Sequence, residues 1–126
     1  MNLREYFENR EGLGVLATAD AEGAVDAALY ARPHVLDDGL LAFIMRDRLS
    51  HANLQSNPSA VYLFVEAGEG YTGKRLYLRR IREEKDTTTI DQLRRRGKHR
   101  PDSGEHVYLV VFEVTDERPL VGNGTA

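Results

Sequence analysis

The sequence contains no cysteine and no tryptophan, and no apolar run in it approaches the length of a membrane span. Without cysteine the chain has neither disulfide bonds nor thiolate metal sites, which fits a reducing cytoplasm. The charged N-terminus, Met1–Glu8, predicts that no secretory signal stands there. A formal net charge of −3 gives no overall attraction to nucleic acid. We therefore expect a cytoplasmic protein that binds neither membranes nor nucleic acid.

Signatures of several enzyme classes are also missing. The four histidines are scattered, at positions 34, 51, 99 and 106, without the spacing of a metal site. No serine lies in a G-x-S-x-G elbow, so hydrolase chemistry is unsupported. Residues 68–74 spell a P-loop, but Arg75 stands where a Mg²⁺-binding Ser or Thr is needed. The arginines at 94–96 are more typical of a solvated helix end than of a phosphate site.

Residue patterns predict a mainly β fold in one domain, residues 1–126. Short runs rich in apolar and β-branched residues, separated by turn residues, are typical of antiparallel strands. The predicted strands are Val15–Ala19, Ala24–Leu36, Leu40–Met45, Ala60–Glu66, Lys74–Arg82 and His106–Thr115. Six such strands with only short helices between them predict a small antiparallel barrel with short flanking helices.

Capping and breaking residues give the boundaries of these elements. Asn2 and Glu5 have capping-box spacing for a first helix, which Gly12 is expected to stop. Pro33 interrupts the second strand and predicts a sheet edge or a bulge there. Early acids, late arginines and a closing glycine predict another helix over residues 86–97.

The apolar content of the strands predicts a second subunit. Val107, Leu109, Val111 and the strand carrying Tyr62 and Phe64 exceed what one small barrel interior is expected to hold. One sheet face is therefore expected to be covered by another copy of the chain.

The connection between two apolar strands, residues 48–58, is the most informative stretch. Ser50 is a suitable N-cap, and Asn57-Pro58 ends the helix because the residue before proline is disfavoured in the α region. Arg48 lies beside this helix start, and a guanidinium next to free backbone N–H groups suits phosphate. The alternative is an ordinary connector helix with polar surface residues.

The order of these pieces resembles the FMN-binding split β-barrel family, related to pyridoxamine 5′-phosphate oxidase. Arg48, Ser50, Asn53-Leu54 and Asn57-Pro58 fall on positions of a family motif. Supporting segments are Gly14–Asp20 with Gly23, Tyr30–Gly39 and Phe43–Pro58. The likeness extends from about residue 13 to 80 and is looser to residue 115.

The resemblance implies a six-stranded split barrel that forms a homodimer with two FMN sites at its interface. It implies that Arg48 and Ser50 hold the phosphate and that Asn53, in the same motif, also binds the cofactor. The ring and ribityl chain would lie along Tyr30, Arg32, Phe43, Ile44 and Met45. Lys74 and Arg75 would reach the cofactor from the partner subunit.

For function, the resemblance implies an FMN-binding flavoprotein that acts as an oxidoreductase. Neither a general acid or base nor a substrate is predicted. Arg32 or a backbone N–H of residues 43–45 would stabilise the reduced flavin. The alternative is a non-catalytic protein that carries flavin, deazaflavin or haem. Ser50 replaces the lysine of many relatives, so phosphate binding is expected to be weaker. The shorter chain lacks tryptophan and the C-terminal substrate motif, so we do not expect vitamin B6 oxidation.

Overall fold

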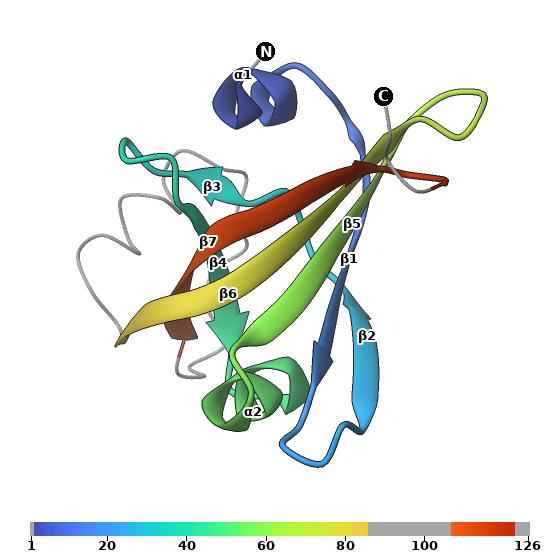
Figure 1. Cartoon of the computed structure of the whole chain (residues 1–126). Helices are drawn as coiled ribbons and strands as arrows, with labels where there is room; N and C mark the ends of the chain where they lie inside the picture. Colours follow the sequence, from blue (N-terminus) through green and yellow to red (C-terminus); the bar gives the residue numbers. More distant parts are fainter. Residues whose placement is uncertain (1, 86–106, 123–126) are drawn as a thin grey trace.

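The computed structural model describes residues 2–85 and 107–122. They form one seven-stranded sheet in the order β2-β1-β5-β6-β7-β4-β3, and all neighbouring strands are antiparallel. The strands are β1 (Gly12–Ala19), β2 (Val25–Leu29), β3 (His34–Val35), β4 (Leu41–Arg46), β5 (Ser59–Glu66), β6 (Gly73–Lys85) and β7 (Val107–Pro119). The helices are α1 (Leu3–Glu8) and α2 (Leu49–Ser56), and they lie at opposite ends of the curled sheet (Figure 1). The predicted antiparallel split barrel is confirmed.

The sheet has seven strands rather than six because the second predicted strand, residues 24–36, divides in two. Its halves, β2 and β3, lie at the two opposite edges of the sheet, although only residues 30–33 separate them in sequence. Pro33 falls in that crossing segment, outside any strand, so no ladder hydrogen bond is required of it, and it lies between the two edge strands rather than in one. The sheet therefore curls far enough for residues 30–33 to join its two edges.

The barrel interior is filled by aromatic and aliphatic side chains. Fully buried residues include Leu16, Tyr62, Phe64, Leu76 and Phe112. Val107, Leu109 and Val111 form a second buried cluster with Ala42, joined by Leu36, Leu40 and Ile44. One chain thus buries the five residues that the sequence argument named, while other apolar residues of β5 stay partly exposed, and the second subunit stays a prediction.

A different apolar face stays open on the outer side of β2, β1 and β5. Val25, Leu29 and Leu13 are 83, 69 and 56% exposed. Strand register aligns these side chains across the face with partly buried neighbours. Those neighbours are Val15, Ala17, Ala19, Val61, Leu63 and Val65. A shallow hollow of about 320 Å³ lies on this face, lined in part by Ala17, Val25, Val61 and Tyr77.

The helix boundaries follow the caps, with two corrections. The Asn2 side chain accepts from the Glu5 N–H at 2.9 Å, as the capping spacing predicts. Helix α1 then ends at Glu8 with Asn9 as its cap, so Gly12 does not stop it and instead opens β1. Arg48, not Ser50, is the N-cap of α2, because the chain is still extended there. Asn57 ends α2 in an extended conformation before Pro58, as predicted.

Strands β6 and β7 are longer than predicted and form a twisted ribbon with register shifts near Leu78 and Arg82. The predicted helix over residues 86–97 and the loop after it lie outside the described residues. Within residues 2–85 and 107–122, no helix is both long and apolar enough to cross a membrane. The single-domain prediction stays a prediction.

Candidate functional site

A cavity of about 330 Å³ opens between β2, the end of β4 and the first turn of α2. Its size falls within the range of small-molecule pockets. It is lined by Asp26, Ala28, Leu29, Tyr30, Ile44, Arg46, Arg48, Leu49 and Ser50. Leu29 and Leu49, 69 and 57% exposed, are part of its rim, so the cavity is continuous with the apolar outer face.

The sharp connection from β4 into α2 brings two guanidinium groups to this cavity. The Arg48 N–H donates to the Arg46 carbonyl at 2.8 Å, and the Arg48 carbonyl accepts from the Ala52 N–H at 2.9 Å. The chain therefore turns from strand to helix between Arg46 and Leu49. The side chain of the N-cap residue, Arg48, makes no capping hydrogen bond to the first turn of α2, and the backbone N–H groups of a helix start suit an anion. Positive charge and hydrogen-bond donors meet at one wall.

Tyr30 also lines the cavity, and its phenol contacts this helix start. Its N–H donates to the Gly14 carbonyl at 3.0 Å, which holds the end of β2 against β1. Burial raises the pKa of the Tyr30 phenol, while a hydrogen bond from Ser50 and the nearby Arg48 charge partly oppose that shift. The phenol is therefore neutral near pH 7 and retains a proton to donate.

The body of α2 is anchored from behind. Asn53, 6% exposed, donates from Nδ2 to Thr18 Oγ1 at 3.0 Å, and Leu54 lies in the barrel core. A buried side-chain hydrogen bond of this kind fixes helix against strand because breaking it leaves two unsatisfied groups. Asn53 thus supports the helix and does not line the cavity.

The structure brings four of the ten predicted cofactor residues to the cavity: Tyr30, Ile44, Arg48 and Ser50. Phe43 and Met45 point the other way, into the core, at 2 and 0% exposure. The alternation of a strand explains this, since Ile44 lies between them. Any contact of Phe43 or Met45 with a ligand in this cavity would have to come from the main chain.

The remaining predicted residues are engaged elsewhere in the chain. Arg32 donates to the Phe7 carbonyl at 2.7 Å and to the Arg10 carbonyl, and so ties the crossing segment to the end of α1. Lys74 pairs with Glu117, and Arg75 donates to the Pro119 carbonyl at 2.8 Å. Their roles toward a cofactor, like those of the other predicted residues, stay predictions.

Five residues that line the cavity were absent from the predicted set: Asp26, Ala28, Leu29, Arg46 and Leu49. A period of two along β2 places Asp26, Ala28 and Tyr30 on one face, so the signal for Asp26 was present in the sequence. Arg46 reaches the cavity because the chain turns tightly at Arg48, and no residue pattern in the sequence predicts that turn. Within the described residues no group of His, Asp and Glu side chains could hold a metal ion.

No family model and no curated protein matches the sequence, but solved structures do. An FMN-binding protein from Syntrophomonas wolfei superposes with a TM-score of 0.70 at 15% identity, over 95% of this chain and 84% of that one. HutZ, the haem storage protein from Vibrio cholerae, gives 0.68 at 16% identity over 94 and 95% of the two chains. An F420 reductase gives 0.65 at 19% identity over 93 and 97%. The chain therefore has the split β-barrel fold that these cofactor-binding proteins share, as the sequence resemblance implied.

Proposed function

We propose that this protein binds FMN, with the phosphate at the helix start of α2, and works as a small flavin-dependent oxidoreductase. The observation that carries the proposal is the cavity wall made by Arg46, Arg48 and the N-terminus of α2. Guanidinium groups and backbone N–H groups are the donors that a phosphate monoester requires. The fold shared with an FMN-binding protein and an F420 reductase supports a flavin-type cofactor over other phosphates.

The residues present fit such a cofactor in three parts. Arg46, Arg48 and the Ser50 hydroxyl would hold the phosphate, and their donor chemistry suits a dianion. The Asp26 carboxylate would accept hydrogen bonds from the hydroxyl groups of a ribityl chain. Ile44 and Leu29 supply apolar surface beside them. Bound FMN would supply the electron-transfer chemistry, while these groups bind and orient it.

The proposed site is completed by a second copy of the chain. A cavity of about 330 Å³ with two exposed leucines at its rim leaves a ring system of flavin size uncovered. The adjoining outer face of β2, β1 and β5 carries apolar side chains in register across three strands. Burying them against a second copy removes this surface from water and closes the rim.

Replacing Val25 with glutamate is expected to disrupt this association, because the new charge would be desolvated in the interface. Val25 lies outside the phosphate cavity. We expect the dimer dissociation constant, measured by sedimentation equilibrium, to rise about 100-fold or more, which corresponds to about 3 kcal/mol. Ile81→Glu is the matched control, since Ile81 is 43% exposed but lies on β6 beyond the residues that pair with β5. Equal dissociation in both variants, or a monomeric wild type, would contradict the proposed interface.

The second candidate is a non-catalytic carrier of flavin, deazaflavin or haem, which the similarity to a haem storage protein favours. An absorbance spectrum of protein purified without added cofactor, followed by titration with FMN and with haemin, separates the candidates. Flavin bands and saturable FMN binding support the proposal. A Soret band with no FMN binding favours the haem carrier. If the bound FMN can be reduced but no added acceptor reoxidises it faster than oxygen does, the flavin carrier is favoured.

A further inference from the structure

Of the nine described residues that line the cavity at the start of α2, Asp26 alone carries a carboxylate. Asp26 is partly buried on β2, and no described residue forms a hydrogen bond or an ion pair with its side chain. Other partly buried carboxylates are engaged: Glu66 accepts from the Tyr6 hydroxyl at 2.6 Å, and Glu83 accepts from Gln55 Nε2 at 3.0 Å. Burial of a charge without a partner costs free energy, so Asp26 is a candidate for contact with a ligand.

Strand pairing directs the Asp26 side chain toward α2. Asp26 lies opposite Thr18 in the antiparallel ladder of β1 and β2, and directly opposite residues project from the same face of a sheet. The Thr18 hydroxyl accepts from Asn53 Nδ2 of α2 at 3.0 Å, so this face is the one that α2 covers. The Asp26 carboxylate therefore lies beside the helix that begins at Arg48.

The Tyr30 phenol, which lines the same cavity, is influenced by charges of both signs. Burial raises the pKa of this phenol, a Ser50 hydrogen bond and the Arg48 charge lower it, and the Asp26 charge raises it further. The acidic and basic groups are thus close enough to act on one side chain. Donors for an anion and an acceptor for a hydroxyl group are present together in one cavity.

This combination has an energetic consequence for a phosphate bound at Arg48. The phosphate and the Asp26 carboxylate carry charges of the same sign, so they repel each other. A hydroxyl group on the same ligand offsets this repulsion, because it donates to the carboxylate in a charge-assisted hydrogen bond. A phosphate ester without hydroxyl groups leaves the carboxylate unpaired beside the anion, and a site of this kind discriminates against such ligands.

We propose that Asp26 is a specificity-determining residue, which makes the cavity select phosphate monoesters of polyhydroxylated chains and reject phosphate esters without hydroxyl groups. The inference rests on the proposed function, because it requires a phosphate at the start of α2. FMN belongs to the selected class, since its phosphate is attached to a ribityl chain. Phosphate esters of plain alkyl or aryl groups belong to the rejected class and should compete poorly for the site.

The test compares two phosphate monoesters with the same three-carbon chain, glycerol 3-phosphate and propyl phosphate, of which only the first carries hydroxyl groups. At about pH 8 both are dianions, since the second pKa of a phosphate monoester is about 6. Binding is followed by NMR through the amide signals of Leu49 and Ser50, in the first turn of α2. We expect the wild type to bind glycerol 3-phosphate about 10-fold more tightly than propyl phosphate, and Asp26→Asn about threefold at most.

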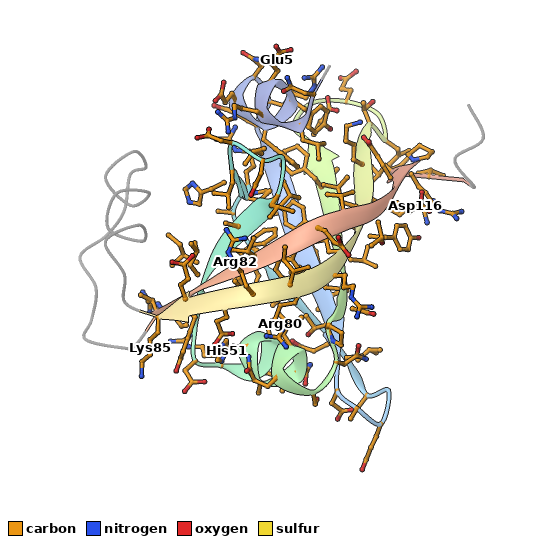
Figure 2. The ribbon with its side chains drawn as sticks, turned by 60° about the vertical axis from the view of Figure 1, so that its left-hand side comes forward. Glu5, His51, Arg80, Arg82, Lys85 and Asp116 are labelled. Carbon is orange, nitrogen blue, oxygen red and sulfur yellow. The ribbon has the colours of Figure 1, made fainter. Side chains whose placement is uncertain are left out.

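Asp47→Asn is the matched control, because it makes the same substitution one residue before Arg48. Asp47 does not line the cavity, and its carboxylate lies 3.2 Å from His51 Nδ1. Figure 2 shows His51 on α2 below the β6–β7 ribbon. Asp47→Asn should therefore keep the wild-type ratio of the two affinities.

The ratio separates a specificity role from a structural one, because a damaged site would bind both esters more weakly by the same factor. The same ratio in the wild type and Asp26→Asn, or no preference in the wild type, would overturn the role of Asp26 and leave the phosphate site standing. Loss of the ratio in Asp47→Asn as well would also overturn it, since charge near Arg48 rather than contact with Asp26 would then decide. If neither ester shifts the α2 amide signals, the proposed phosphate site is overturned, and the role of Asp26 with it.

Discussion

Replacing Arg48 with alanine is expected to weaken FMN binding by about 10- to 100-fold. The substitution removes a guanidinium from the cavity wall at the N-terminus of α2, where it would make charged hydrogen bonds to the phosphate. Such bonds contribute about 1.5–3 kcal/mol each, and 1.4 kcal/mol is a factor of ten in affinity. Quenching of flavin fluorescence during titration of the apoprotein measures the change.

Two controls make the result specific to the phosphate. Riboflavin has the same ring and ribityl chain without the phosphate, so its affinity should be nearly unchanged in Arg48→Ala. Arg79→Ala removes an exposed arginine of β6 that does not line the cavity, and it should bind FMN as the wild type does. Unchanged FMN affinity in Arg48→Ala would remove this residue from the phosphate site, and equal losses for both ligands would point to a misfolded helix start.

Replacing Gly14 with alanine is expected to destabilise the fold by about 3 kcal/mol or more, the upper range for overfilled cores. A Cβ at this position would lie 1.9 Å from the Tyr62 hydroxyl oxygen and 2.6 Å from the Tyr30 carbonyl oxygen. Neither atom moves easily, because the Tyr62 hydroxyl donates to that same carbonyl at 3.1 Å and Tyr62 is fully buried. Urea denaturation followed by circular dichroism measures the loss of unfolding free energy.

Gly39→Ala separates steric crowding from backbone strain. Gly39 has a φ of +84° but open space around its Cβ position, so only the conformational penalty of about 1 kcal/mol applies. If Gly14→Ala lowers the free energy of unfolding by no more than Gly39→Ala does, β1 does not approach Tyr62 as closely as described. Because Gly14 also holds Tyr30, the Gly14 variant should lose FMN affinity as well.

The sequence predicted most of the strands and the C-terminal end of α2 because period-two alternation and Asn57-Pro58 are local signals. It did not reveal that Pro33 separates two edge strands of one sheet, since edge positions depend on pairings between residues far apart. The N-cap was misplaced by two residues because Ser50 is a good cap by type. In the structure the hydroxyl of Ser50 is turned to Tyr30, and only the path of β4 determines where the helix starts.

The sequence predicted that the site lies at the start of α2, but it did not predict all of the residues that line the cavity. Arg48, Ser50, Tyr30 and Ile44 meet as expected, whereas Phe43 and Met45 were assigned to the same wall as Ile44 although strand alternation separates them. The apolar argument for a second subunit named buried residues, because residue type alone does not tell an inner strand face from an outer one. Val25 and Leu29 are the residues that form the exposed apolar face, and the sequence argument did not name them.

The position of β1 in the sheet also has a consequence for biosynthesis. β1 is paired on one side with β2, which follows it closely, but on the other side with β5, where Leu16 lies opposite Tyr62. The ribosome releases the N-terminus first, so β1 and β2 leave the exit tunnel as a hairpin with no third strand. An isolated hairpin is marginally stable in water. The first strands to be made therefore wait, with their apolar side chains in solvent, until the residues of β5 emerge and the sheet can close.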